Sequence, residues 1–230
     1  MSDDVHHGHP TGVPVPRPGV GGPEPVAVDD TLAEVLWRSR ELGFLGQGGI
    51  QAHVRNARAF VAELGPVRRV VDLGSGGGVP GLVVAVDRPD LDLVLVEAAQ
   101  RRVDFLLDVV EELGLTRHVV VEHGRAEELA RRPDLRGTFD VVTARSFATP
   151  AVTAECAVGF MSGPGATLLV SEPPTDPGDR WPEVGLARLG LTPGQRRDHG
   201  GTTIQRIDMT RACDERYPRR VGIPAKRPLF

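Results

Sequence analysis

The stretch at residues 69–81, RVVDLGSGGGVPG, constrains the fold of this chain more than any other part of the sequence. Apolar residues flank Asp72 and lead into a glycine-rich run, which predicts a buried strand that ends in a tight loop. Glycine suits such a loop because its backbone turns sharply and lets a ligand approach closely. The apolar run at residues 82–86 predicts a helix after the loop, and Pro80 suits its first turn, where no N–H is needed. The stretch therefore predicts a strand–loop–helix unit that holds a ligand at its loop.

The spacing of the glycines distinguishes between the ligands that such a loop holds. A dinucleotide fingerprint, G-x-G-x-x-G, fails because Val79 occupies the place of its third glycine. A Walker phosphate loop is excluded because its lysine is absent. The pattern D-x-G-x-G-x-G is complete at Asp72, Gly74, Gly76 and Gly78, and it resembles the first motif of class I S-adenosylmethionine (SAM) methyltransferases. The loop therefore predicts SAM as the cofactor, with a ligand-free glycine turn as the competing interpretation.

The composition limits the class of protein. Cys156 and Cys213 are the only cysteines among 230 residues, too few and too isolated for a disulfide framework or a zinc site. We expect His6, His7 and His9 to lie in a solvated tail rather than a metal site. The net charge of −4 argues against non-specific coating of nucleic acid but allows a local basic patch. No signal peptide or membrane-spanning stretch is recognisable, so we expect a cytoplasmic monomer with no membrane partner and no metal.

The chain divides into parts that differ in composition. Residues 1–28 are rich in proline and glycine and are expected to be disordered. A capping box at Thr31 and Glu34 predicts the first of two helices that precede the glycine loop. Residues 211–230 carry six basic and two acidic residues with three prolines, which predicts an extended basic tail. These features predict a tail (1–28), a methyltransferase domain (29–210) with a helical cap (29–65) and an α/β core (66–210), and a basic tail (211–230).

Strands and helices alternate after the glycine loop. Apolar runs predict strands at residues 91–96, 119–121, 140–143 and 167–170, and residues 204–209 suggest a further edge strand. The region between Glu172 and Gly201 is dense in proline and glycine, and we assign no element there. Continuous apolar strands that alternate with helices predict a doubly wound, mostly parallel sheet covered on both faces. The fold class is therefore α/β and Rossmann-like, of the class I methyltransferase type, with an N-terminal helical cap.

Polar residues with suitable chemistry follow several of the predicted strands. In such sheets ligands bind at the carboxyl ends of the strands. Glu97 ends the second strand, about twenty residues past the glycine loop, where an acid accepts hydrogen bonds from both ribose hydroxyls. Ala126 and Glu127 follow the third strand, where a small residue and an acid suit an adenine ring. Arg145 follows the fourth strand and is expected to face an anionic or π-rich ligand.

Taken together, these strand ends resemble one methyltransferase family. The strings VVDLGSGGGVPGL, LVLVEAAQRRVDFL, HGRAEEL, FDVVTARSFA and ERYPRRVGIPAKRPL are similar to those of the glucose-inhibited division protein B family, over residues 50–150 and 215–229. His53 and Asn56 also resemble a His-and-Asn element that this family carries before its first strand. The resemblance implies an enzyme that transfers a methyl group from SAM to N7 of a guanine in small-subunit ribosomal RNA.

The resemblance also implies roles for individual residues. Gly74 and Val79 would line the methionine end of the cofactor, and Arg145 would lie where cofactor and substrate meet. Arg101 matches a basic position that the family uses toward RNA. The full set expected at the cofactor is Asp72, Gly74, Ser75, Gly76, Gly78, Val79, Glu97, Ala126, Glu127 and Arg145, and the set expected at the RNA is Arg101, Arg102, Arg219 and Arg220.

Two departures from the family concern the substrate side. The fifth strand ends in Val-Ser-Glu-Pro, with Glu172 near the place where the family usually has a Leu-Lys-Gly run. Residues 200–202 stand where the family tends to carry an arginine. A carboxylate at the mouth of the site would repel RNA phosphates. The sequence therefore predicts an intact cofactor site beside a substrate face that has lost positive charge.

The chemistry and the departures leave three functions open. Guanine N7 has an in-plane lone pair and no proton, so methylation there needs no general base, and Arg145 is expected to contribute by positioning and charge. The first function is ribosomal RNA guanine-N7 methylation. The second is a methyltransferase of the same fold that acts on another substrate. The third is a cofactor-binding relic without catalysis.

Overall fold

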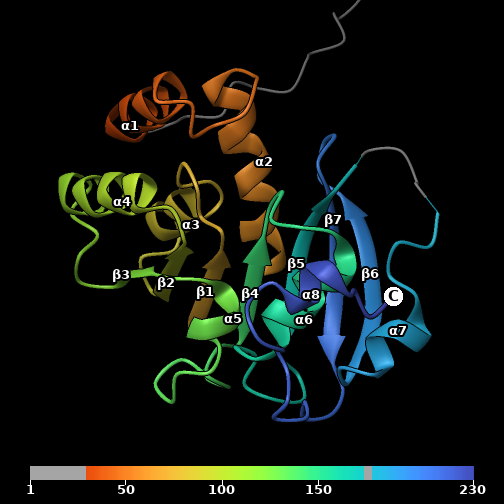
Figure 1. Ribbon diagram of the computed structural model, residues 1–230. Helices are drawn as coiled ribbons and strands as arrows, with labels where there is room; N and C mark the ends of the chain where they lie inside the picture. The colour runs from red at the N-terminus through yellow and green to blue at the C-terminus, as the bar shows by residue number, and fades with distance from the viewer. Residues whose placement is uncertain (1–29, 174–177) are drawn as a thin grey trace, which may run out of the picture.

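The computed structural model describes residues 30–173 and 178–230, so the predicted tail at residues 1–28, with its three histidines, lies outside the described residues. Within these described residues, seven strands form one sheet in the order β3-β2-β1-β4-β5-β7-β6 (Figure 1). The first five strands of that order are parallel, and β7 is antiparallel to both β5 and β6. The strands are β1 (Arg69–Leu73), β2 (Asp92–Glu97), β3 (Val119–His123), β4 (Val141–Ala144), β5 (Thr167–Glu172), β6 (Leu191–Asp198) and β7 (Thr203–Met209).

Helices cover both faces of the sheet. Figure 1 shows α6 and α8 in front of the sheet and α2 behind it. Because side chains alternate along a strand, Val70 and Val71 of β1 are both buried but belong to different hydrophobic clusters. The helices are α1 (Asp30–Glu41), α2 (Ile50–Glu63), α3 (Gly81–Asp87), α4 (Gln100–Glu112), α5 (Ala126–Leu129), α6 (Pro150–Val158), α7 (Glu183–Ala187) and α8 (Ile223–Lys226).

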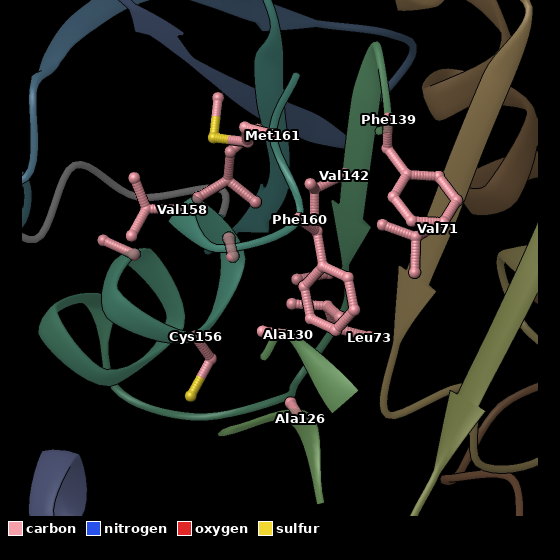
Figure 2. Packing of buried hydrophobic residues seen from close by; sticks show 14 of the residues in the cluster. Val71, Leu73, Ala126, Ala130, Phe139, Val142, Cys156, Val158, Phe160 and Met161 are labelled. Carbon is pink, nitrogen blue, oxygen red and sulfur yellow. The ribbon is translucent and has the colours of Figure 1, made fainter. Parts of the chain in front are cut away.

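The two clusters form the core on either side of the sheet. One joins Val70 and Leu95 to apolar residues of α1, α2, α3 and α4. The other, part of which is drawn in Figure 2, joins Val71 and Val142 to residues of α5, α6 and α7. The rings of Phe139 and Phe160 meet edge to face within the second cluster, with centroids 6.0 Å apart. The doubly wound, mostly parallel α/β fold with a helical cap is confirmed.

Two local predictions are wrong, and one strand was not predicted. Residues 204–209 form β7, which lies between two strands and not at the edge. The edge strand is β6, in the region without a prediction, because its polar residues and its irregularity between Pro193 and Arg196 hide the strand pattern. Thr31 lies within α1, which includes Asp30 in its first turn, so it does not cap the helix from outside.

The basic segment at residues 211–230 packs onto the domain, so the prediction that it is extended is wrong. The ring of Tyr217 is buried in the second cluster, and α8 packs against α6. The Arg219 guanidinium donates two hydrogen bonds to the Glu155 carboxylate, at 2.7 and 2.6 Å. The charge of the segment suggested a solvated tail, whereas its few apolar residues and one ion pair hold it in place.

The topology places the first site residues beside one another. The chain runs from β1 outward through β2 and β3, and then returns to the other side of β1 through β4. β1 and β4 are parallel neighbours, with Leu73 opposite Ala144 at their carboxyl ends. Ligands bind at such a reversal of strand order because the loops that follow the two strands diverge there.

Candidate functional site

The glycine-rich loop after β1 adopts the conformation that its sequence predicts. Gly74, Gly76 and Gly78 have positive φ values of 64°, 55° and 90°, which residues with a side chain rarely adopt. The Gly76 N–H donates to Glu97 Oε2 at 2.9 Å, and the Ser75 N–H donates to the carbonyl of Val96 at 3.0 Å. The loop is therefore fixed to the carboxyl end of β2.

Asp72, the acid of the glycine motif, lies beneath the loop and does not reach a cavity. It is fully buried and accepts a hydrogen bond from Thr143 Oγ1 at 2.7 Å. Its Oδ2 has no hydrogen-bond partner of normal geometry in the described chain, although the nearby Gly81 N–H acts to lower the pKa. Burial dominates and raises the pKa of Asp72 to about 6. The expectation that Asp72 contacts the cofactor is thus corrected: it supports the loop from below.

The raised pKa of Asp72 predicts a pH-dependent stability. Because the folded state favours the protonated acid, its stabilising contribution is complete below about pH 4 and is lost as the pH rises through about 6. Relative to Asp72→Asn, the wild-type free energy of unfolding should fall by on the order of 2–3 kcal/mol between pH 4 and pH 7. Urea unfolding of both proteins at the two pH values measures this difference. A difference independent of pH would contradict it.

Glu97, at the end of β2, holds three backbone N–H groups. Its Oε2 accepts from Gly76, and its Oε1 accepts from Ala98 at 2.8 Å and Ala99 at 2.9 Å. The residue is 5% exposed, and Arg102 Nη1 lies 3.9 Å from Oε2. Each carboxylate oxygen accepts about two hydrogen bonds, so one acceptor position stays free on Oε2. In this conformation Glu97 has room for one ribose hydroxyl, not for the two that the sequence suggested.

Two adjoining cavities open above the carboxyl ends of β1, β2 and β4. They have volumes of about 220 and 270 Å³ and share Gly74, Arg102 and Ser146. The first is lined by Gly74, Val96, Glu97, Ala98, Arg102, Gly124, Arg125, Ala126, Glu127, Ser146 and Phe147. The second is lined by Phe44, Leu45, Gly46, Gly74, Ser75, Gly76, Gly77, Val79, Arg102, Arg145 and Ser146. The predicted adenine residues therefore line one cavity, and the residues predicted for the methionine end line the other.

Arg145 reaches the second cavity from the end of β4 and is held there by a histidine of α2. Its Nη2 donates to His53 Nδ1 at 2.9 Å, and His53 Nε2 lies 3.1 Å from the carbonyl of Gly46. Burial and the Arg145 charge lower the pKa of His53, and burial lowers that of Arg145. A neutral imidazole that accepts from Arg145 and donates to Gly46 satisfies both contacts. His53 thus joins the helical cap to the arginine of the site.

The cap also closes over the glycine loop. Ser39 Oγ of α1 donates to the carbonyl of Gly77 at 2.9 Å, and both groups are buried. A Cβ at Gly77 would lie 2.9 Å from the carbonyl oxygen of Phe44 and would overlap Ser39. The guanidinium carbons of Arg101 and Arg102 each lie 5.8 Å from the centre of the Phe44 ring. Gly77 is therefore required because the cap lies directly against the loop.

Gly76→Val is expected to weaken cofactor binding at least tenfold. Its Cβ would lie 3.6 Å from the Gly74 carbonyl oxygen and 3.9 Å from that of Phe44, so the side chain fits but enters the cavity. The positive φ adds a strain of about 1–2 kcal/mol, so the variant should also be less stable. Calorimetric titration with SAM and urea unfolding measure the two effects. Gly114→Val is the matched control, because Gly114 has a similar φ of 68° and no atom near its Cβ. Equal losses of affinity in both variants would contradict this prediction.

Some predicted site residues lie outside the cavities or have other partners. Gly78 packs against Leu82 of α3 and lines neither cavity. Glu127 lines the first cavity, but its Oε1 also accepts from the Gly222 N–H at 3.1 Å. Among the predicted RNA contacts, Arg101 and Arg220 are exposed, Arg102 lines both cavities and Arg219 is paired with Glu155. Arg219 therefore has a structural partner that the sequence did not reveal.

Ser146 and Phe147 line the site but were not predicted. Ser146 has a φ of 53° and is the one non-glycine residue with a positive φ among those described. Such strain often occurs at functional sites. The Phe147 ring lies against Gly74, where a Cβ would approach its Cδ2 to 2.7 Å. Both residues follow Arg145 directly, and no spacing rule distinguishes them from an ordinary loop.

We also examined the described residues for another large cavity, a metal site and a membrane-spanning helix. A larger cavity of about 590 Å³ lies at the amino ends of β1, β4 and β5, is lined by residues such as Arg68, Asp140 and Thr167, and contains none of the predicted site residues. In the described residues, no group of three or more histidine, cysteine, aspartate or glutamate side chains is arranged for a metal ion. No helix in residues 30–173 and 178–230 has the length and apolarity to cross a membrane.

The two adjoining cavities fit the parts of SAM. The glycine loop, where an added Cβ would take up space, allows a ligand to approach the backbone closely, and Glu97 offers an acceptor for a ribose hydroxyl in the first cavity. Ala126 and Phe147 provide apolar surface for an adenine ring in the first cavity. Arg145 and Arg102 supply positive charge for a carboxylate at the second.

Comparison with solved structures supports the fold. The chain resembles the O-methyltransferase TomG from Streptomyces achromogenes in complex with SAM, with a TM-score of 0.58 and 22% identity over 80% of this chain and 92% of that one. It also resembles an O-methyltransferase from Bacillus cereus in complex with SAH, with a TM-score of 0.59 and 17% identity over the same shares. At these identities the likeness establishes a class I methyltransferase fold.

Comparison of sequences establishes the family. The model of the family described as rRNA small subunit methyltransferase G matches residues 49–171. A ribosomal RNA small subunit methyltransferase G from Prochlorococcus marinus (strain MIT 9313) is 38% identical over 70% of this chain and 68% of its own length. One from Lactobacillus delbrueckii subsp. bulgaricus is 32% identical over 70% of each. The chain belongs to the rRNA small subunit methyltransferase G family.

Proposed function

We propose that this protein transfers a methyl group from SAM to N7 of a guanine in small-subunit ribosomal RNA. One observation supports this most strongly: the cavity lined by Gly74 and Glu97 adjoins the cavity lined by Arg145 at the reversal of strand order. Family membership supports the same reaction, since the curated relatives are named as methyltransferases of small-subunit ribosomal RNA.

The reaction requires positioning more than proton transfer. When bound, SAM supplies an electrophilic methyl group, whose bond to sulfur breaks with both electrons kept by sulfur while guanine N7 forms the new bond with its lone pair. N7 carries no proton, so no side chain has to act as a general base. The purine becomes positively charged during the transfer. The protein therefore contributes by holding both reactants in line and by excluding water.

The residues of the site divide this task between them. Glu97 accepts a ribose hydroxyl and fixes the loop through Gly76. Arg145, held by His53, binds an anionic group of the reactants at the second cavity. The closed contact of Ser39 with Gly77 keeps the cap over the loop. Each of these groups holds or orients, in agreement with a reaction that moves no proton before methyl transfer.

The negative charge of Glu172 weakens the substrate face less than the sequence suggested. Arg101 and Arg220 are exposed, and Arg102 is partly exposed beside the cavities. The Glu172 side chain is only 3% exposed and forms an ion pair with Arg180 at 2.6 Å, so its charge is compensated. The expected repulsion between Glu172 and RNA phosphates is corrected accordingly. We propose that the protein acts as a monomer on ribosomal RNA or the small subunit in the cytoplasm.

Labelled methyl transfer tests the function. Small ribosomal subunits and their naked RNA are incubated with the protein and labelled SAM, and the nucleosides are then separated by mass spectrometry. The expected product is 7-methylguanosine, with no product from the Gly76→Val protein at limiting SAM. Calorimetric binding of SAH without transfer to either RNA would favour a cofactor-binding relic, and transfer to another nucleoside would favour a different substrate.

A further inference from the structure

A third cavity lies beside the two cofactor cavities, at the carboxyl ends of β4 and β5. Its volume is about 300 Å³, at the small end of the range for ligand sites. It shares Ser146 with both cofactor cavities and Phe147 with one of them. We name it the acceptor cavity and define it by Ser146, Phe147, Ser171, Glu172, Arg180 and Trp181.

The outer wall of the acceptor cavity is built around Glu172. Its Oε2 accepts from Arg180 Nη1 at 2.6 Å, and its Oε1 accepts from Trp181 Nε1 at 3.0 Å. The carboxylate is buried, the tryptophan is 6% exposed, and the Arg180 side chain stays 30% exposed. One buried acid therefore fixes an aromatic ring and a partly exposed cation at the same wall. The function of the cofactor cavities uses none of these three residues.

The inner boundary is the strained segment after β4. Ser146, with its positive φ, lies at the point where the three cavities meet. Phe147 lines both the acceptor cavity and the cavity that contains Glu97. Because Ser146 also lines the cavity of Arg145, a group held in the acceptor cavity lies next to that cavity. This is the arrangement that a transfer between two bound molecules requires.

We infer that the acceptor cavity receives the guanine that is methylated, turned out of the RNA, with Phe147 and Trp181 against the base and Arg180 toward its phosphate. The inference rests on the proposed function. Enzymes that modify a base extrude it into a pocket and hold it by stacking on aromatic side chains. Arginine suits the phosphate because its planar donors match phosphate oxygens. Glu172 acts as a positioning residue that fixes Arg180 and Trp181.

Tryptophan emission reports on this cavity without any methyl transfer. The sequence has two tryptophans, so Trp37→Phe leaves Trp181 as the single tryptophan, which is excited selectively at wavelengths that tyrosine does not absorb. Trp37 is 51% exposed on α1 and lines none of the three cavities. Guanosine 5′-monophosphate is titrated into this protein with the cofactor cavities filled by SAH. We expect saturable quenching of Trp181, with weaker binding of cytidine 5′-monophosphate.

Two matched substitutions locate the binding. Ser171 lines the acceptor cavity and neither cofactor cavity, whereas Ser162 is exposed at the cavity at the amino ends of β1, β4 and β5. Ser171→Phe should raise the Kd for guanosine 5′-monophosphate at least tenfold, and Ser162→Phe should change it less than twofold. SAH affinity should stay within threefold of wild type in both. Ser171→Leu is the smaller substitute if the phenylalanine prevents folding.

The outcomes separate this inference from the proposed function. Two results would overturn the inference that this cavity holds the acceptor base, even if the wild-type protein methylates RNA. One is an unchanged Trp181 emission at saturating nucleotide. The other is an equal loss of affinity for guanosine 5′-monophosphate in the Ser171 and Ser162 variants. Quenching that Ser171→Phe abolishes would support the cavity even if ribosomal RNA proves a poor substrate. Glu172→Gln should weaken quenching and raise the KM for RNA more than it lowers kcat, since it loosens Arg180 without touching the cofactor cavities.

Discussion

Arg145→Met is expected to lower kcat for methyl transfer by about two to three orders of magnitude, the range found when one preorganised charge or donor is removed from an active site. The side chain is one of two arginines that line the second cavity, and it is largely buried there. Methionine retains much of the apolar stem but has no charge. Single-turnover transfer of labelled methyl groups to small subunits measures the change. The SAH affinity of the variant serves as the control for folding.

His53 provides a second and more specific test of the same arrangement. His53→Phe keeps the ring volume but removes the acceptor for Arg145 and the donor for Gly46. His53→Gln supplies both groups again. The phenylalanine variant should lose roughly tenfold to a hundredfold in kcat, because small displacements of a positioned group cost that much, and the glutamine variant should recover most of the loss. Equal activities in the two variants would mean that His53 only fills space.

Arg219→Met is expected to lower the free energy of unfolding by about 3 kcal/mol. The Glu155 side chain is fully buried and receives hydrogen bonds from the Arg219 backbone N–H at 2.9 Å and from its guanidinium. Removal of the guanidinium leaves a buried carboxylate without its counter-charge, which explains the size of the effect. Chemical denaturation of the full chain provides the measurement.

The adjacent arginine is the control for this prediction. Arg220 is exposed, so Arg220→Met should change the free energy of unfolding by less than about 0.5 kcal/mol. If Arg219→Met also leaves stability unchanged but weakens RNA binding, its side chain serves the RNA, as the sequence alone suggested. Equal stability losses in the two variants would point to a general effect of charge rather than to the pair with Glu155.

Local patterns were enough to predict the parallel half of the sheet. Apolar residues flank Asp72 in β1 (Arg69–Leu73) and run without a break up to Glu97 in β2 (Asp92–Glu97), which predicts both strands. The glycine motif after β1 and Glu97 at the end of β2 then predict that the site lies at the carboxyl ends of the strands. The three positive-φ glycines follow from spacing alone, because each occupies a place in one motif. These features depend on residues that are close in the chain.

The features that were missed depend on residues far apart in the chain. The partner of Arg219 is Glu155, 64 positions earlier, and no local pattern links the two residues, so Arg219 was expected to contact RNA. Glu172 looked like a repulsive carboxylate because its pairing with Arg180 and Trp181 lies across a segment without a recognisable pattern. The strain at Ser146 has no sequence signal, since it is imposed by the packing around the end of β4.

The contact between Glu127 and Gly222 joins the C-terminal segment to the cofactor site. The carboxylate that borders one cofactor cavity accepts a hydrogen bond from the Gly222 N–H at 3.1 Å. Residues 211–230 therefore help to order the wall of that cavity. A protein that a protease trims near residue 210 retains the glycine loop but loses both this contact and the Arg219 pair. The glycine motif alone is thus no sign that the wall around Glu127 is intact.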